Sequence, residues 1–143
     1  MSVTQLSVFI ENKPGHLEQI LETLGQGGIN LIALTVAETA DFGVLRMILP
    51  DPAKAADLLR SRQITCSATE VLAVELDDCP GALRETLKTF SKRNLNIEYM
   101  YAFAEKHKDK AVMIFRFDNM DEAKKAVQQA GYRILQQSDL GDH

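Results

Sequence analysis

The hydrophobic and polar positions of this chain follow one pattern that occurs twice. Pro14-Gly15 recurs as Pro80-Gly81, and Asn30 recurs as Asn96, each pair 66 positions apart. The apolar positions between these anchors also correspond: Leu17 with Leu83, Leu21 with Leu87, Leu24 with Phe90, Ile29 with Leu95, and Leu31 with Ile97. This period is too long for a solenoid repeat, and two copies are too few for an array. The pattern indicates a duplicated domain, and we expect one copy in residues 1–69 and the other in residues 70–143.

Each copy opens with a strand pattern and continues with a helix pattern. Residues 5–10 and 71–76 alternate polar and apolar positions, which predicts half-buried strands. Pro14 suits the first turn of a helix, and Gly27-Gly28 and Asn94 are residues that end helices. The apolar stripes between these limits predict amphipathic helices: Leu17, Ile20, Leu21 and Leu24 in the first copy, and Leu83, Leu87 and Phe90 in the second.

The remainder of each copy predicts two further strands, a helix and a last strand. The second helices begin at Asp51-Pro52 and at Asn119, which is followed by Glu122 at the spacing of a capping box. The order β-α-β-β-α-β, with two helices on one face of an antiparallel sheet, is the ferredoxin-like α+β unit. The expected strands are residues 31–37, 44–49 and 64–67 in the first copy, and 97–103, 112–117 and 133–136 in the second.

The second strand of the first copy has aliphatic residues on both of its faces. We expect Ile32, Leu34 and Val36 to point away from the helices. Two explanations remain open: either the assignment of faces is wrong, or a partner chain buries this face of the sheet. Arg46, Arg116 and Glu98 are also expected on outward positions, where a cross-strand ion pair is plausible.

Composition describes an ordinary globular chain without a strongly charged half. The net charge is −4 over 143 residues, and each half carries about half of it, which argues against a nucleic-acid arm or a basic membrane surface. The first ten residues alternate and lack a basic segment, so they do not resemble a signal peptide. With no apolar run of membrane-spanning length, we expect a cytoplasmic protein with reduced Cys66 and Cys79.

No set of residues in the sequence suggests catalysis. His16, His107 and His143 share no metal-ligand spacing, and no nucleophile or phosphate-loop motif occurs. Asp77-Asp78 is an acidic pair at a strand-to-helix turn, where a capping role suffices. We therefore expect no enzyme activity, no metal and no cofactor.

The turns before Pro-Gly are the better candidates for a binding site. Asn12 and Asp78 each place a polar side chain just ahead of a helix N-terminus. Free N–H groups and the positive end of the helix dipole favour a carboxylate there, and glycine lets a ligand approach the backbone. For a single turn of this kind, the alternative is a tight turn with nothing bound. The turn occurs twice, each time with an asparagine (Asn30 or Asn96) at the start of the next strand, and this repetition favours binding.

The motifs around these turns resemble those of the ACT domain, a small-molecule sensor that most often binds amino acids. Glu11-Asn12-Lys13-Pro14-Gly15-His16-Leu17 and Gly28-Ile29-Asn30-Leu31 carry the resemblance in the first copy. Asp77-Asp78-Cys79-Pro80-Gly81-Ala82-Leu83 and Asn94-Leu95-Asn96-Ile97 carry it in the second. The resemblance covers essentially the whole chain. It implies two modules side by side in an extended eight-stranded antiparallel sheet, as in stand-alone tandem ACT proteins.

The resemblance also implies which residues bind the ligand. Asn12 would hydrogen-bond an amino acid, the N–H groups of His16 and Leu17 would hold its carboxylate, and Asn96 or Asn30 of a facing module would complete the clamp. In the second site Asp78 replaces Asn12, so the two sites need not be equivalent. The full expected set is Asn12, Lys13, Pro14, Gly15, His16, Leu17, Asn30, Leu31, Asp78, Cys79, Gly81, Ala82, Leu83, Asn96 and Ile97.

The leading hypothesis is a non-catalytic regulator that binds a free amino acid between two ACT modules and acts as a homodimer. Its alternatives are a regulatory subunit that controls a biosynthetic enzyme by contact, similar to the small chain of acetolactate synthase, and a small ferredoxin-like enzyme. The His16 side chain is expected either to be an exposed bystander or to touch the ligand. Tyr99, Tyr101 and Phe103 are expected either to pack against the helices or to line the pocket.

Overall fold

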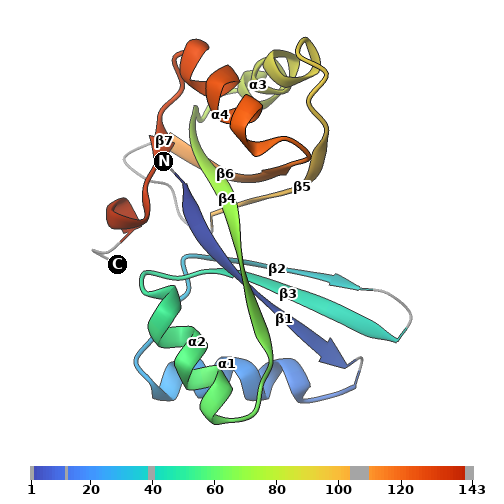
Figure 1. Cartoon of the computed structure of the whole chain (residues 1–143), viewed down its shortest axis with the longest axis vertical. Coiled ribbons are helices and arrows are strands. Elements are labelled where there is room, and N and C mark those ends of the chain that lie inside the picture. Colours follow the sequence, from blue (N-terminus) through green and yellow to red (C-terminus); the bar gives the residue numbers. More distant parts are fainter. Residues whose placement is uncertain (1, 12, 39–40, 104–109, 141–143) are drawn as a thin grey trace. The chain divides into compact units, whose positions relative to one another are not determined.

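The computed structural model describes residues 2–11, 13–38, 41–103 and 110–140 of the chain (Figure 1). The chain divides into two compact units, one built around Thr4–Thr69 and the other around Glu70–Asp139. We call them module 1 and module 2 and describe each by itself. Among the described residues, none of the helices combines the length and apolar character that crossing a bilayer requires.

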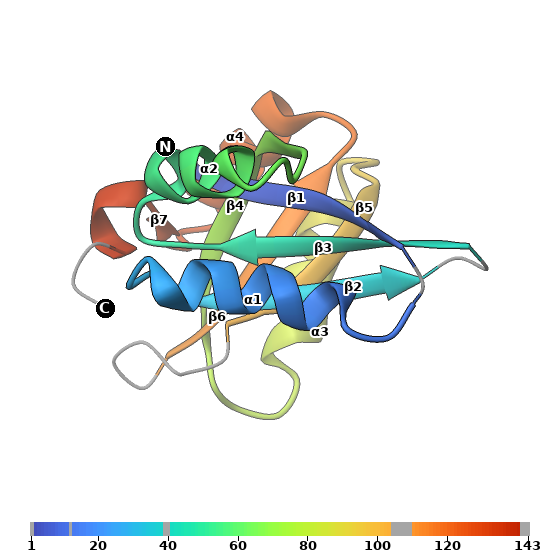
Figure 2. The same cartoon turned by 90° about the horizontal axis from the view of Figure 1, so that it is seen from below.

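Module 1 is a layer of antiparallel strands with both of its helices on one face (Figures 1 and 2). Strand β3 lies between β1 and β2, with Val8 opposite Leu45 and Leu34 opposite Met47. The elements in chain order are β1 (Val3–Glu11), α1 (His16–Gln26), β2 (Ala33–Glu38), β3 (Phe42–Ile48) and α2 (Pro52–Ser61).

Module 2 repeats this arrangement and adds a short closing strand. Its strand order is β7-β4-β6-β5, and each neighbouring pair is antiparallel. Helices α3 and α4 lie on one face of these strands (Figure 1). The elements are β4 (Cys66–Asp77), α3 (Ala82–Ser91), β5 (Ile97–Ala102), β6 (Lys110–Phe117), α4 (Met120–Gln129), β7 (Ile134–Leu135) and a 3₁₀ turn, η1 (Gln137–Leu140).

The α+β fold with two ferredoxin-like modules is confirmed, with two differences in detail. The described part of the chain has seven strands rather than eight, because the last strand expected in the first copy and the first strand of the second copy are one continuous strand, β4. Pro14 is also not in the first helical turn: α1 begins at His16, and Gly15 is its N-cap. Each proline instead lies in the turn that leads into the helix.

The cores of the two modules occupy equivalent positions but differ in chemistry. In module 1, Leu24, Met47 and Leu49 are fully buried. The corresponding positions of module 2 hold three phenylalanines: the ring of Phe90 meets Phe115 and Phe117 edge-on at centroid distances of 5.3 and 4.7 Å. Because aromatic pairs add specific contacts to apolar burial, module 2 has the more cohesive core centre.

The expected outward face of the second strand is wrong. Leu34 and Val36 lie opposite Met47 and Leu45, which are fully buried core residues on the helix side. Val36 packs against that core, and Ile32 is buried. The first of the two explanations, a mistaken assignment of faces, is therefore correct. The expected ion pair does form, between Arg116 Nε and Glu98 Oε1 at 3.5 Å.

The tyrosines of β5 face away from the helices of module 2. Tyr99 lies opposite Arg116, and Tyr101 lies opposite Ile114. Phe115, the β6 residue between these two partners, belongs to the core cluster packed by the helices, and its own partner in β5 is Met100. The expectation that the tyrosines pack against the helices is therefore wrong, and Met100 takes that place.

Candidate functional site

Both Pro-Gly turns hold their glycine in the same left-handed conformation. Gly15 has φ 89° and Gly81 has φ 87°, and each is the N-cap of the helix that follows. A residue with a Cβ is strained at such a φ, whereas glycine is not. No atom outside the chain neighbours lies within 4 Å of a Cβ built at either position. The turns therefore leave open space directly over the start of α1 and α3.

The four helices differ in how the described residues cap their N-termini. Asp51 accepts a hydrogen bond from the backbone of Lys54 at 3.1 Å, and Asn119 accepts one from Glu122 at 3.1 Å. In the part of the chain that the structure describes, which does not include Asn12, no side-chain hydrogen bond caps α1 or α3. Because the first N–H groups of a helix have no partner within it, these two N-termini can donate hydrogen bonds to a ligand anion.

In module 1 a small pocket lies beside the turn. Its volume is about 120 Å³. Lys13 Nζ contacts Glu11 Oε2 at 3.0 Å, and this ammonium lowers the pKa of the Glu11 carboxyl. The pocket combines groups of both charges with an apolar floor, which suits a zwitterion. It is lined by Ile10, Glu11, Lys13, Leu17, Val36, Glu38, Phe42 and Gly43.

The His16 side chain has a structural role in the turn. Its Nδ1 accepts a hydrogen bond from the backbone N–H of Glu11 at 2.9 Å. This bond ties the end of β1 to the first turn of α1. The His16 side chain is therefore not an exposed bystander. Its Nδ1 is already hydrogen-bonded and is not free to contact a ligand. Asn12, which the sequence places at the centre of the site, lies outside the described residues.

In module 2 the pocket beside the turn is larger and more acidic. Its volume is about 410 Å³, and it is lined by Asp77, Cys79, Pro80, Gly81, Ala82, Glu85 and Tyr132. Lys110 forms an ion pair with Asp77, and the hydrogen bond that the ammonium donates to this carboxylate raises the pKa of Lys110. The carboxylates of Asp77 and Glu85 at this wall each form an ion pair with a lysine, Lys110 and Lys88 respectively.

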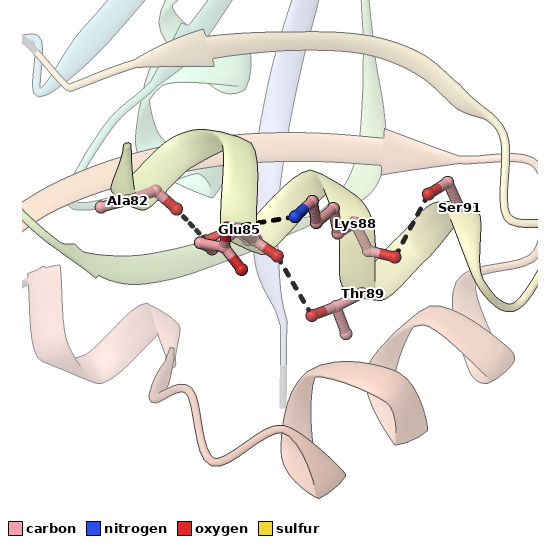
Figure 3. Close-up of polar contacts among 6 residues, drawn as sticks. Ala82, Glu85, Lys88, Thr89 and Ser91 are labelled. Atoms are coloured by element: carbon pink, nitrogen blue, oxygen red, sulfur yellow. Dashed lines mark hydrogen bonds and ion pairs between the residues drawn. The ribbon is translucent and has the colours of Figure 1, made fainter. Parts of the chain in front are cut away.

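Helix α3 supplies Glu85 to this pocket and holds the side chain through neighbours on its own surface (Figure 3). Lys88 Nζ contacts Glu85 Oε1 at 3.4 Å. The hydroxyls of Thr89 and Ser91 donate to the backbone carbonyls of Glu85 and Lys88. Thr86 is buried and donates to the carbonyl of Ala82 at 3.0 Å. The polar side chains of α3 therefore mostly form hydrogen bonds and ion pairs with other groups of the same helix.

The strand-two residues do not meet the turn of their own module. Asn96 lies at the Phe117 end of β6, where its N–H donates to Asp118, whereas the turn follows Asp77 at the Lys110 end. These ends are roughly 24 Å apart at 3.4 Å per residue. In module 1, Asn30 and Leu31 likewise lie at the end of the sheet opposite to the turn. In module 2, Ile97 lies next to Asn96 at that far end. A clamp of the expected kind thus requires residues from two different modules.

Sequence reasoning found the turns but not all of the pocket walls. Five of the expected ligand-binding residues line these pockets: Lys13, Leu17, Cys79, Gly81 and Ala82. Pro14, Gly15, His16 and Leu83 are not among the described lining residues, and ligand binding by any residue of the expected set stays a prediction. The missed residues come from neighbouring elements: Glu38, Phe42, Glu85 and Tyr132. Glu85 could have been predicted from the sequence, since it lies one helical turn after Gly81. Within the described residues, no group of three or more potential ligands is placed to hold a metal ion.

Comparison with known proteins gives one family and several solved structures. A family model described as an ACT domain pair matches residues 1–142. The crystal structure of protein BT0572 from Bacteroides thetaiotaomicron is similar at a TM-score of 0.92 and 38% identity, covering 100% of this chain and 98% of that one. No curated protein matches.

More distant structures share the fold alone. The regulatory subunit of aspartate kinase from Thermus thermophilus, in its ligand-free form, has a TM-score of 0.60 at 15% identity and covers 92% of this chain and 94% of its own. The regulatory subunit from Thermus flavus has a TM-score of 0.60 at 14% identity, with 91% and 93% covered.

Proposed function

The chain belongs to the family of ACT domain pairs, and we propose that it is a non-catalytic regulator that binds a free amino acid between two ACT modules. ACT domains are regulatory modules, which supports the ligand-sensing part of this proposal. The observation that carries it is the contrast between helices: side chains cap α2 and α4, whereas α1 and α3 begin at left-handed glycines with no side-chain cap among the described residues.

Module 1 supplies the better site for a zwitterionic amino acid. The carboxylate would accept hydrogen bonds from the N–H groups of His16 and Leu17 and lie near Lys13, while Glu11 and Glu38 attract the ammonium. The pocket of about 120 Å³ is small, so a facing module would supply further contacts to a larger amino acid. Asn96 or Asn30 of that module would provide the remaining polar contacts, together with Leu31 or Ile97.

Module 2 would bind an amino acid of a different kind, or would bind the same amino acid more weakly than module 1. Asp78 and Cys79 stand where module 1 has Asn12 and Lys13, so the basic group is missing from the turn. Lys13 supports a carboxylate ligand at the turn of module 1, whereas the turn of module 2 has Asp78 and no lysine. We therefore expect occupancy of the first site before the second.

Thermal unfolding with each of the twenty amino acids in millimolar excess tests this proposal. A ligand at about 100 times its Kd stabilises the folded state by about 2.7 kcal/mol. The Tm then rises by several degrees, at about 2–8 °C per kcal/mol. One amino acid, or a few related ones, should shift the Tm.

Variants then locate the site. Lys13→Ala, and separately the double change Asn12→Ala with Asn96→Ala, should reduce the shift. Lys54→Ala is the matched control, because Lys54 is an exposed lysine of the same module that does not line the pocket. A flat panel of amino acids contradicts the proposal, and an unchanged shift in the double variant contradicts the clamp.

Control of a biosynthetic enzyme by protein contact is the second candidate. The sequence motivated it through an aliphatic outer face at Ile32, Leu34 and Val36, and these side chains are buried or on the helix side. We therefore place it behind amino-acid binding. Co-purification with a large enzyme from the native cell would reverse this order. The cytoplasmic location expected from the sequence stays a prediction.

A further inference from the structure

Module 1 has an exposed apolar hollow on the face of its sheet that points away from the helices. Phe9 lies between Val8 and Ile10, which belong to the core on the helix side, so its own side chain points to the other face. Phe9 is 68% exposed and Phe42 is 57% exposed. The hollow has a volume of about 440 Å³, and its lining residues are Phe9, Ala37, Phe42, Gly43 and Val44. We call it the Phe9–Phe42 hollow.

The hollow lies on the same sheet face as the charged pair beside the Pro-Gly turn. Side chains two positions apart on a strand share a face, so Glu11 follows Phe9 on the face away from the helices. Glu11 lies directly opposite Phe42 in β3, and Phe9 lies opposite Val44. Lys13 Nζ contacts Glu11 Oε2 at 3.0 Å. An ion pair and two exposed rings are therefore neighbours at this end of the sheet.

The hollow adjoins the pocket beside the turn and differs from it in chemistry. Phe42 and Gly43 line both spaces. The pocket has the charged groups of Glu11, Lys13 and Glu38, whereas none of the described residues that line the hollow has a charged or hydrogen-bonding side chain. A charged group placed in the hollow would lose its hydration without gaining a side-chain partner. A molecule with a zwitterionic head and an apolar side chain matches this division.

The exposed apolar surface of this face is confined to the end beside the turn. Gln5, Ile48 and Ala33 form one row across β1, β3 and β2 on the same face, and all three are buried. The two exposed rings offer roughly 250 Å², since a phenylalanine side chain presents about 150–250 Å². Each partner in a small specific protein interface buries about 600 Å². The exposed area therefore suits the side chain of a small molecule better than a protein partner.

We propose that the ligand of module 1 is an aromatic amino acid and that Phe9 and Phe42 bind its ring. The inference rests on the proposed function, because the charged head of the ligand uses the pocket at the turn, and it adds the class of side chain. A cavity of about 150 Å³ accepts a benzene ring, so the hollow has room for a phenyl, phenol or indole group. Aromatic rings gain contacts with one another beyond apolar burial, which favours an aromatic over an aliphatic side chain.

Module 2 has charged residues at the corresponding positions. Glu75 and Lys110 take the places of the two phenylalanines. They form ion pairs with Arg133 and Asp77, so this part of module 2 offers no ring a stacking partner. We therefore expect one tight site for an aromatic amino acid per chain, in module 1.

Isothermal titration calorimetry of the full chain with each of the twenty amino acids tests the class of side chain. Phenylalanine, tyrosine or tryptophan should bind about tenfold or more tightly than alanine, which has the same head and no ring. Phe9→Ser should weaken binding of the aromatic amino acid by about fivefold or more and change the affinity for alanine by less than about twofold. Phe9 is the sharper position, because it does not line the pocket that holds the head.

Phe42→Ser is the second variant, and Leu34→Ser is the matched control. Phe42 lines both spaces, so its loss should weaken binding of the aromatic amino acid at least as much as the loss of Phe9. Leu34 is a 44% exposed apolar residue of the same module on the opposite face of the sheet, and its loss should leave every affinity unchanged. Circular dichroism and the Tm without ligand will show that the variants fold, since all three side chains are exposed.

The two kinds of negative result have different meanings. If none of the twenty amino acids binds, the proposed function fails and the ring site fails with it. If amino acids bind but small, aliphatic or charged ones bind most tightly, the regulator stands and the ring site is overturned. The ring site is also overturned if Phe9→Ser leaves the affinity for the aromatic amino acid unchanged, or if Leu34→Ser lowers it equally.

Discussion

Modules 1 and 2 share a fold and differ most where the fold does not constrain them. Their strands have the same register: Glu11 lies opposite Phe42 in module 1, and Asp77 lies opposite Lys110 in module 2. At the Phe42 end of the sheet, the face away from the helices exposes Phe9 and Phe42 in module 1, whereas the corresponding residues of module 2, Glu75 and Lys110, form ion pairs. The pattern that builds the core is therefore the same in both copies, while the chemistry of the outer face differs.

The two modules also differ in their cores, and this difference predicts the largest effect on stability. Phe90→Ala should lower the free energy of unfolding of module 2 by about 3–5 kcal/mol, since it empties the centre of a three-ring cluster. Leu24→Ala, the matched change in module 1, should cost about 2–5 kcal/mol. Urea unfolding of both variants measures the difference. A smaller cost for Phe90→Ala than for Leu24→Ala would contradict the view that module 2 has the more cohesive core centre.

The two Pro-Gly turns should respond alike, which tests their structural equivalence. Gly15→Ala and Gly81→Ala should each destabilise the protein by about 1–2 kcal/mol, because the cost comes from the positive φ alone. Gly25→Ala is the control within α1, where alanine should stabilise by about 0.5–1 kcal/mol. Thermal unfolding of the three variants gives these values. Unequal effects at Gly15 and Gly81 would show that the two turns differ despite their shared geometry.

A charge contact found in module 2 predicts the smallest effect and a pH dependence. Lys124 Nζ lies 2.9 Å from Glu70 Oε2, and its hydrogen bond lowers the pKa of Glu70 below the ordinary 4.5. A carboxyl whose pKa falls on folding stabilises the folded state above its unfolded pKa and loses that contribution as the pH falls through the folded pKa. Lys124→Met should therefore cost less than about 1 kcal/mol at neutral pH, since the pair is partly exposed.

The control for this contact is the neighbouring lysine. Lys125 is exposed on α4, and Lys125→Met should leave the free energy of unfolding nearly unchanged at every pH. The difference between the two variants, measured by urea unfolding from pH 7 down to about pH 3, should disappear in acid. A difference that stays constant over this range would mean that Lys124 acts through the packing of its aliphatic stem.

The order of elements could be predicted because it depends on local rules. Two copies gave the same strand and helix periods, and the left-handed Gly28 and Asn94 follow the ends of α1 and α3 as expected. The caps at Asp51 and Asn119 are also where the sequence placed them. The capping box at Asn119 is only half formed, since Asp118 accepts from the Asn119 N–H and Glu122 instead pairs with Arg93.

The faces of the edge strands could not be predicted in the same way. β2 contains aliphatic residues at both alternating sets of positions, so hydrophobicity alone does not choose between them. The register with β3 chooses, because Leu34 and Val36 face the buried Met47 and Leu45. The opposite set, Ala33, Thr35 and Ala37, then shares a face with Phe9.

The sequence by itself determined the duplication, the α+β architecture and the two Pro-Gly turns, because helix periods, strand alternation and glycine requirements act over a few residues. Only the tertiary structure decided which groups surround each turn. Glu38, Glu85 and Tyr132 reach the pockets from strands, helices and loops whose approach depends on register and helix packing. The same pairing also placed the turn and the strand-two asparagine of a module at opposite ends of its sheet, because β1 and β2, like β4 and β5, run in the same direction on either side of a shared antiparallel neighbour.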